Sequence, residues 1–225
     1  SGRGFRWYEP RMSLVIRTLS DQLVDLVRNR ILSGVVSSDH AIRQDALAAE
    51  LGVSKIPLRE ALARLEEEGL IRSQANRGFF VSPMSASEAR EVYQLRLTLE
   101  PEATALAARL ATEADHAHAR ETLASLYSVT DEHGEGVGAF NRAFHRALFR
   151  PCGKPITINI LERLQVLSER YVRMHLEPLG RDERANEEHQ ELLQAWLERD
   201  ADRVAVLVRA HIGKTIEDLH QQLGE

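Results

Sequence analysis

Apolar residues recur at helical spacing through most of the chain, and the clearest example lies near residue 50. A first apolar face ends at Leu51, Gly52 follows, and a second face carries Leu58, Leu62 and Leu65 at i, i+4 and i+7. Glycine adopts the left-handed backbone conformation of a tight turn without steric penalty. This pattern predicts a helix, a turn at the glycine and a second helix.

The limits of the second helix are marked by residues with known positional preferences. Ser54 stands at the N-cap position, where its hydroxyl is expected to accept a backbone N–H, and Pro57 is tolerated in the first turn. Gly69 is expected to end the helix. Two short apolar segments, 70–71 and 78–81, then flank a polar hairpin tip. The whole stretch therefore predicts a winged helix-turn-helix.

In a helix-turn-helix the second helix can lie in the major groove of DNA. Lys55 and Arg59, on the side opposite the leucines, can reach phosphates or guanine edges, and the wing tip can contact the adjacent minor groove or backbone. The alternative is a helical hairpin with solvated basic residues, which does not account for the wing. The predicted DNA contacts are Ser54, Lys55, Ile56, Pro57, Arg59, Asn76, Arg77 and Gly78.

The rest of the chain shows helical periodicity. A helix is expected at 14–32, before the motif, and six more follow the Pro83 boundary, at 85–110, 112–133, 139–149, 154–176, 181–199 and 201–223, with a glycine-rich loop at 134–138. Helices joined by short turns form antiparallel bundles that can enclose a ligand pocket. We therefore divide the chain into a disordered or tag-like N-terminus (1–13), a DNA-binding domain (14–83) and an all-helical ligand-binding, metal-binding and dimerisation domain (84–225).

Composition narrows the class of protein. The single cysteine, Cys152, excludes an internal disulfide and suits a reducing cytoplasm. The sequence contains no signal-peptide pattern and no apolar run near the ~20 residues of a membrane span, so we expect a cytoplasmic protein without a membrane partner.

The net charge of −5 is distributed unevenly. Residues 14–83 carry nine Lys/Arg and nine Asp/Glu, whereas residues 84–225 carry seventeen against twenty-four, a net charge of −7. A neutral domain with clustered cations can still dock on phosphates. The acidic second domain should weaken non-specific DNA binding and increase its salt sensitivity.

Three of the nine histidines lie on separate predicted helices, where they can converge. They are His145, His189 and His211, and Asn141 lies one turn before the first of them. Imidazole suits zinc, nickel, iron or manganese, and separate helices of a bundle commonly supply such ligands. Spacing alone leaves open the alternative of hydrogen-bonded histidines in the core.

The segment LGVSKIPLREALARLEEEGLI (51–71), followed by NRGFFV (76–81), resembles the winged-helix signature of the GntR transcription regulators. The residues after it resemble the C-terminal FCD ligand domain of that family's FadR-type branch. Lys55 departs from the pattern, because the family more often has arginine there, and lysine lacks the bidentate fork that reads guanine. The resemblance implies a mainly α protein, with an N-terminal winged helix-turn-helix and an all-α antiparallel bundle of six to seven helices.

The resemblance also implies a metal site. Metal-binding FCD domains use an aspartate four residues before a histidine and one histidine on each of two later helices. In this chain the corresponding residues are Asn141, His145, His189 and His211, with asparagine in place of aspartate. Because the carboxylate charge is lost, metal affinity should fall, and the bound divalent cation should favour an anion in its open positions.

The effector site is expected beside the metal. Arg96 resembles the family's cavity arginine, and the alternative for it is a surface ion pair with Glu100 at i+4. Arg142, Tyr171 and Arg173 are further candidates to line the pocket.

These features favour a transcription regulator, more specifically a repressor. A homodimer would bind double-stranded, palindromic operator DNA, and a small carboxylate (a sugar acid, hydroxy acid or dicarboxylate) would bind the metal and Arg96. Alternatives are a metal-dependent hydrolase-like protein, a metal-free ligand-binding protein with a DNA-binding module, and a scaffold. An enzyme is disfavoured because the ligands have no assignable general base, although Glu187 and Glu188 lie near His189.

Overall fold

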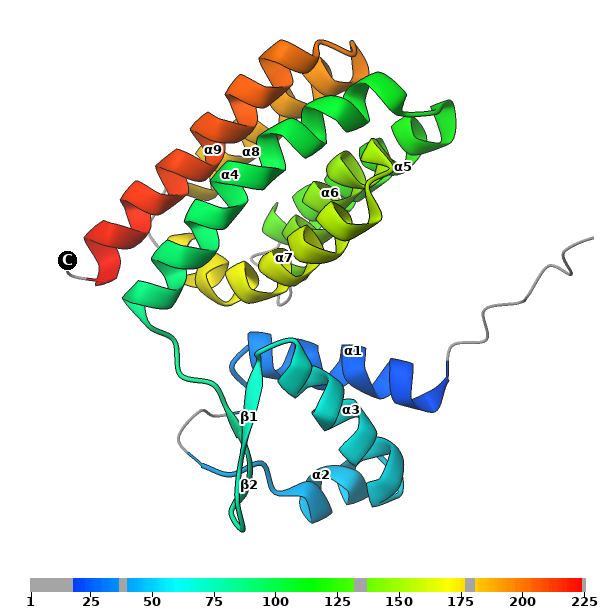
Figure 1. The fold of residues 1–225 in the computed structure, drawn as a ribbon, viewed down its shortest axis with the longest axis vertical. Coiled ribbons are helices and arrows are strands. Elements are labelled where there is room, and N and C mark those ends of the chain that lie inside the picture. The colour runs from blue at the N-terminus through cyan, green and yellow to red at the C-terminus, as the bar shows by residue number, and fades with distance from the viewer. Residues whose placement is uncertain (1–17, 37–39, 132–136, 177–180, 224–225) are drawn as a thin grey trace, which may run out of the picture.

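The structure, a computed structural model, describes residues 18–36, 40–131, 137–176 and 181–223. Within these residues a winged helix-turn-helix lies beside a larger bundle of helices, as Figure 1 shows. The mainly α fold expected from the sequence is confirmed. The tag-like stretch 1–13 and positions 14–17 of the first expected helix lie outside the described residues.

The winged helix consists of three helices and one hairpin. Its strands are antiparallel, with Ile71 opposite Val81 and Gln74 opposite Gly78, and Ala41 adds an isolated bridge to Phe80. The elements are α1 (Leu19–Leu32), α2 (Gln44–Glu50), α3 (Lys55–Glu67), β1 (Ile71–Gln74) and β2 (Gly78–Val81).

The turn between α2 and α3 depends on Gly52, whose φ is +66°. Its N–H donates to the Ala49 carbonyl at 3.2 Å, and the Val53 N–H donates to the Ala48 carbonyl at 3.0 Å. This pair of hydrogen bonds is the Schellman motif, which satisfies the last carbonyls of a helix. Gly69, with φ +87°, follows the end of α3, as its position in the sequence predicts.

The start of α3 differs in detail from the prediction. Ser54 occupies the N-cap position with an extended backbone, but its side chain makes no capping hydrogen bond within the described structure. The hydroxyl is exposed at the outer end of the helix. Pro57 lies in the first turn, where its missing N–H removes no helical hydrogen bond.

The bundle begins after the linker 82–85. Ser85 caps the first helix by accepting the Glu88 N–H at 3.1 Å. The predicted loop at 134–138 is shorter at its end, because positions 137 and 138 already belong to a helix, while 134–136 lie outside the described residues. The elements are α4 (Ala86–Leu110), α5 (Glu113–Asp131), α6 (Val137–Phe149), η1 (Arg150–Cys152), α7 (Pro155–Leu176), α8 (Arg181–Leu197) and α9 (Ala201–Leu223).

Two main apolar cores form. The leucines of α3 that the sequence placed on one face, Leu58, Leu62 and Leu65, are all fully buried in the core of the winged helix. In the bundle, Trp196 is fully buried and donates its indole N–H to the Leu148 carbonyl at 3.0 Å. None of the helices in the described ranges is both long and apolar enough to cross a membrane.

Helix α7 connects the two parts of the molecule. Its Val166 is a member of the winged-helix core, although the helix packs mainly against α4, α6 and α9 of the bundle. Arg170 donates to the Ser82 carbonyl, and the Tyr171 hydroxyl donates to the Ser85 carbonyl at 3.2 Å. The linker and the winged helix are therefore held by the same helix.

Candidate functional site

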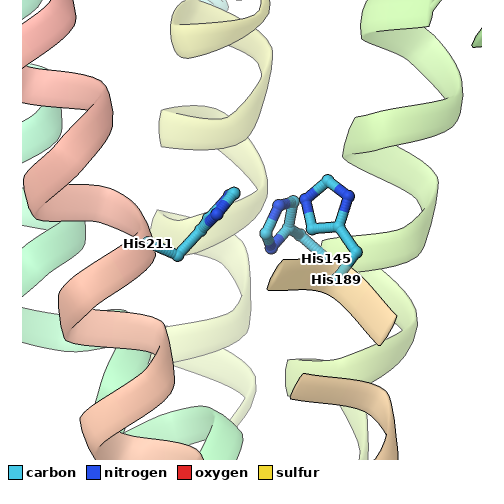
Figure 2. Close-up of side chains that lie close together, drawn as sticks. All are labelled: His145, His189 and His211. Carbon is cyan, nitrogen blue, oxygen red and sulfur yellow. The ribbon is translucent and has the colours of Figure 1, made fainter. Parts of the chain in front are cut away.

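Three histidine side chains meet inside the bundle. His145 comes from α6, His189 from α8 and His211 from α9, and Figure 2 shows their rings turned towards a common centre. One nitrogen of each ring lies within 4.8 Å of the others, and the ring centroids are 4.7–5.2 Å apart. His145 and His189 are each 3% exposed, so the cluster is shielded from solvent. The structure thus brings together the histidines that the sequence singled out.

The cluster has the chemistry that a divalent cation requires. Burial, the other two histidines and Arg96 hold the pKa of His145 well below its usual 6.5, so the ring is neutral. A neutral imidazole has the free lone pair that binds a metal. In the described part of the chain, His145 Nε2 is buried and has no hydrogen-bond partner. A buried polar atom of this kind calls for an explanation, and a metal provides one.

Asn141 lies one helical turn before His145 on α6 and is half-buried. The i, i+4 spacing places both residues on the same side of the helix. Its role as a fourth, neutral ligand stays a prediction.

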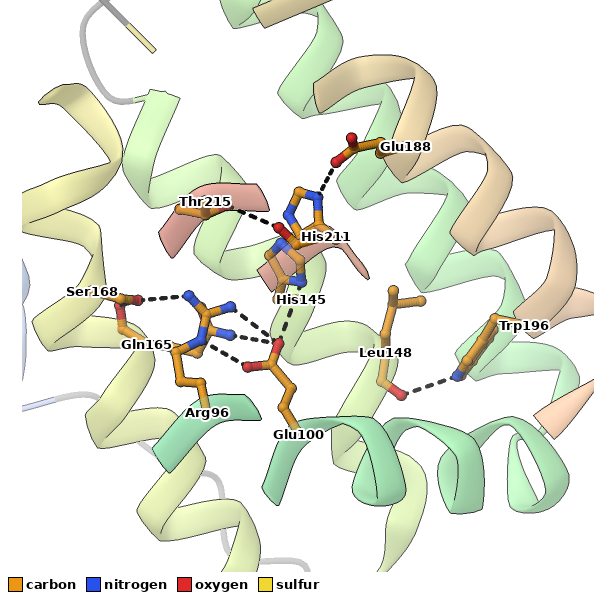
Figure 3. Close-up of polar contacts among 10 residues, drawn as sticks. All are labelled: Arg96, Glu100, His145, Leu148, Gln165, Ser168, Glu188, Trp196, His211 and Thr215. Atoms are coloured by element: carbon orange, nitrogen blue, oxygen red, sulfur yellow. Dashed lines mark hydrogen bonds and ion pairs between the residues drawn. The ribbon is translucent and has the colours of Figure 1, made fainter. Parts of the chain in front are cut away.

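Arg96 lies next to the cluster in a buried network that Figure 3 shows. Its Nε donates to Glu100 Oε2 at 2.8 Å and its Nη2 to Glu100 Oε1 at 3.2 Å, while Nη1 donates to Ser168 Oγ at 3.2 Å. Glu100 Oε1 in turn lies 3.5 Å from Nδ1 of His145. The i, i+4 ion pair considered from the sequence does form, but in the interior and against the histidines rather than on the surface.

Two of the other three candidates for the effector pocket make their polar contacts elsewhere. Arg142 donates its Nε to Glu169 of α7 at 2.6 Å and lines a cavity of about 630 Å³ between the winged helix and the bundle. Tyr171 is fully buried, with its hydroxyl on the backbone of the linker at Ser85. The side chain of Arg173 lies outside the described residues. A role for Arg142 and Tyr171 in effector binding stays a prediction.

Several polar residues around the cluster were not predicted as site residues. Glu188 was noted only as a possible general base, yet its Oε2 lies 2.7 Å from Nδ1 of His211 and its Oε1 accepts from Lys214 at 2.7 Å. Although burial alone would raise it, these two hydrogen bonds lower the pKa of Glu188 to about 2. Glu100 had a weak signal, a carboxylate in an apolar helical segment, whereas Gln165 had none.

The network around Glu100 reaches α7. Gln165 is buried and donates its Nε2 to Glu100 Oε1 at 2.9 Å, and the same residue lines the cavity against the winged helix. The next residue, Val166, packs in the winged-helix core. One turn of α7 therefore contacts both the surroundings of the histidines and the winged helix.

The predicted DNA-binding residues form the outer end of α3 and the tip of the wing. Ser54, Lys55, Ile56 and Arg59 are exposed, and Ile56 is 71% exposed although it is apolar. The ammonium group of Lys55 pairs with the Asp45 carboxylate at the start of α2.

The wing tip presents a further exposed cation, Arg77. The guanidinium of Arg77 lies 5.4 Å from the centre of the Phe80 ring. Asn76 and Gly78 have φ values of +61° and +91°, which asparagine and glycine tolerate better than other residues. Pro57 and Gly78, half-buried, complete the predicted set.

Family models match both the winged helix and the bundle. The model for the FCD domain matches residues 91–214, and the model for bacterial regulatory proteins of the gntR family matches residues 19–81. The HTH-type transcriptional regulator BphR of Paraburkholderia xenovorans is 32% identical, over 92% of this chain and 87% of its own length. The Nta operon transcriptional regulator of Aminobacter aminovorans is 32% identical, over 79% and 83%.

A named repressor and solved structures are also similar. The HTH-type transcriptional repressor GlaR of Escherichia coli is 27% identical, over 88% of this chain and 94% of its own. The structure of Escherichia coli McbR/YncC superposes with a TM-score of 0.79 at 25% identity, covering 91% of this chain and 98% of that one. A GntR regulator from a Rhodococcus species shares the fold, with a TM-score of 0.72 at 19% identity over 90% and 97%.

Proposed function

Since the chain belongs to the gntR family of bacterial regulatory proteins and is a transcriptional regulator of the GntR/FCD type rather than an enzyme, we propose that it is a cytoplasmic repressor controlled by a small carboxylate. Residues 14–83 would bind double-stranded operator DNA, and residues 84–225 would bind the effector and form the homodimer. Two relatives, GlaR and RspR of Escherichia coli, are named as repressors, which supports repression rather than activation.

The observation that carries this proposal is the convergence of three histidines in the bundle. His145, His189 and His211, with Asn141 beside them, would hold a divalent metal such as zinc, nickel, iron or manganese. When bound, the metal would supply positive charge that neutral ligands leave uncompensated, which favours an anionic effector. A sugar acid, a hydroxy acid or a dicarboxylate fits this requirement.

Arg96 would contribute to effector binding less directly than the sequence suggests. Both edges of its guanidinium are taken up by Glu100 and Ser168. An effector carboxylate would therefore share Arg96 with Glu100 or displace it. Either event would disturb the network that reaches Gln165 and α7.

Helix α7 supports a route from the effector to the DNA-binding surface. The helix contacts Glu100 through Gln165 and the winged-helix core through Val166. A shift of α7 would change the orientation of the winged helix relative to the bundle in each protomer. The spacing between the two α3 recognition helices of the dimer would change with it. Coupling of about 1–3 kcal/mol would change operator affinity by roughly 5–150-fold.

The experiment begins with selection of an operator from a random duplex library by the purified full-length protein. We then measure its affinity by fluorescence anisotropy for wild type, Arg59→Ala and Arg120→Ala. Arg120 is an exposed arginine on α5 and is the control for loss of one charge. We expect Arg59→Ala to weaken binding by about 1–3 kcal/mol, the cost of one base-reading contact, and Arg120→Ala to change it little.

Each measurement is made with EDTA and with added Zn²⁺. A zinc-dependent operator affinity supports the metal-centred site, whereas an operator affinity that is the same in EDTA and in Zn²⁺ favours the metal-free alternative. If Arg59→Ala binds as tightly as wild type, the assignment of α3 as the recognition helix is wrong.

A further inference from the structure

Each histidine ring has two nitrogens, and the hydrogen bond made by one decides which form the other takes. In this cluster two rings have a carboxylate on the same nitrogen. Nδ1 of His211 lies 2.7 Å from Glu188 Oε2, and Nδ1 of His145 lies 3.5 Å from Glu100 Oε1. Because a carboxylate accepts but does not donate, the hydrogen bond to Glu188 selects the His211 tautomer with its proton on Nδ1, and the negative charge of the nearby Glu100 oxygen favours the same tautomer of His145.

We propose that Glu188 and Glu100 are positioning residues for metal binding, which hold the Nδ1–H groups of His211 and His145 so that both rings present Nε2 to the shared centre. This inference rests on the proposed metal-centred function and specifies how the ligands are oriented. Outer carboxylates commonly act in this way on metal-binding histidines.

The placement of the atoms agrees with this assignment. Figure 3 shows Glu188 on the far side of the His211 ring from His145, so the nitrogen that it contacts is directed away from the cluster. At His145, the nitrogen not facing Glu100 is Nε2, which is buried and lacks a hydrogen-bond partner in the described part of the chain.

Both glutamates are themselves held in place, so they are available as acceptors without becoming ligands. Lys214 donates to the second oxygen of Glu188 at 2.7 Å, and Arg96 and Gln165 donate to Glu100. The positive charges of Lys214 and Arg96 also offset the two negative charges of the glutamates. The metal charge would therefore remain available to an anionic effector.

Of the two glutamates, Glu188 should have the larger effect on the placement of the histidine rings. It precedes His189 in α8 and contacts His211 in α9. This hydrogen bond joins the two helices that supply two of the three histidines. Loss of an outer hydrogen-bond partner typically weakens metal binding by about 10–100-fold. Glu188→Ala should show a loss in this range.

Variants of Glu188 separate the effect of its hydrogen bond on metal affinity from the effect of its charge. Glu188→Gln removes the charge but keeps an oxygen acceptor, so it should retain most of the wild-type affinity for the metal. Glu188→Asp keeps the charge but withdraws it by one methylene, so it should lose affinity as the alanine variant does. Glu187→Ala is the matched control, because it removes an exposed carboxylate from the adjacent position of α8.

The first test uses the metal-free, full-length protein. Long-range ¹H–¹⁵N NMR of the histidine rings reads which nitrogen carries the proton. We expect His211 and His145 in the Nδ1–H form, and His211 in a tautomer mixture in Glu188→Ala. An Nε2–H form of either ring in the wild type would overturn the proposal.

The second test is a Zn²⁺ titration against a chromophoric chelator, with circular dichroism to verify folding. A loss of about 10–100-fold in Glu188→Ala and Glu188→Asp, with Glu188→Gln and Glu187→Ala close to wild type, supports the proposal. Unchanged affinity in Glu188→Ala, or an equal loss in Glu187→Ala, overturns it. If wild type takes up no Zn²⁺, the metal-centred function fails, and the tautomer measurement still decides whether the glutamates orient the rings.

Discussion

Gln165→Leu should uncouple operator affinity from the three-histidine centre. Gln165 is 1% exposed, and its Nε2 donates to Glu100 Oε1 at 2.9 Å. Leucine has a similar volume and cannot make this bond. Glu100 keeps both hydrogen bonds from Arg96, so its carboxylate is not left without a donor.

The size of the effect follows from the bond that is lost. A hydrogen bond to a charged group contributes about 1.5–3 kcal/mol. Coupling between two sites is typically about 1–3 kcal/mol, so this one bond can account for most of it. Suppose that zinc changes the operator affinity of wild type tenfold, which is about 1.4 kcal/mol. If the network through Gln165 carries the signal, zinc should leave the operator affinity of Gln165→Leu nearly unchanged.

The assay is fluorescence anisotropy on the selected operator, in EDTA and in saturating Zn²⁺. The ratio of the two dissociation constants measures the coupling. Gln194→Leu is the matched control, because Gln194 makes the same type of bond to Glu198 on the exposed surface of α8. Zn²⁺ affinity is measured in parallel, so that a loss of coupling is not confused with a loss of metal.

Coupling through Gln165 is refuted if Gln165→Leu binds Zn²⁺ and operator as wild type does and keeps the wild-type ratio of the two dissociation constants. The signal would then pass through other contacts of α7, such as those of Arg170 at the linker. An equal loss of coupling in Gln194→Leu would point to a general effect on the bundle.

Three further outcomes are expected. By elemental analysis, wild type and His118→Ala, which changes an exposed histidine on α5, should each contain the metal, whereas His145→Ala should lack it. Asp45→Asn releases the Lys55 ammonium from its ion pair, so duplex affinity should rise at low salt, with a salt dependence steeper by about 0.9 in the log–log slope if one more phosphate is contacted. Arg199 has φ +60° and donates to carbonyls at the end of α4 at 2.7–3.4 Å, so in urea denaturation Arg199→Ala should lower the free energy of unfolding by about 1–3 kcal/mol. Arg199→Gly should lower it by about 1 kcal/mol less, because glycine relieves the left-handed backbone, and the opposite order would contradict this account.

The sequence by itself determined the elements of the fold. Helix limits depend on residues a few positions apart, such as the turn at Gly52 and the cap at Ser85, and these were predicted to within a few residues. The apolar repeat of Leu58, Leu62 and Leu65 likewise identified the buried face of α3. Local signals of this kind can be read without knowledge of tertiary contacts.

Recognition of the histidines needed more than local signals. The sequence context singled out His145, His189 and His211 but left hydrogen-bonded histidines in the core as the alternative, and the family resemblance favoured a metal site. The structure then brought the three rings within contact of one another. Asn141 is placed by the helix period alone, and its role stays a prediction.

Only the tertiary structure decided what surrounds those rings. Glu188 contacts His211 across 23 positions of sequence, and Gln165 contacts Glu100 across 65. No periodicity relates such residues, because their approach depends on how α4, α7, α8 and α9 pack. The same packing placed the Arg96–Glu100 pair in the interior, where an i, i+4 spacing is equally compatible with an exposed pair. The sequence therefore determined which helices form and which histidines they carry, whereas helix packing determined the side chains that surround those histidines.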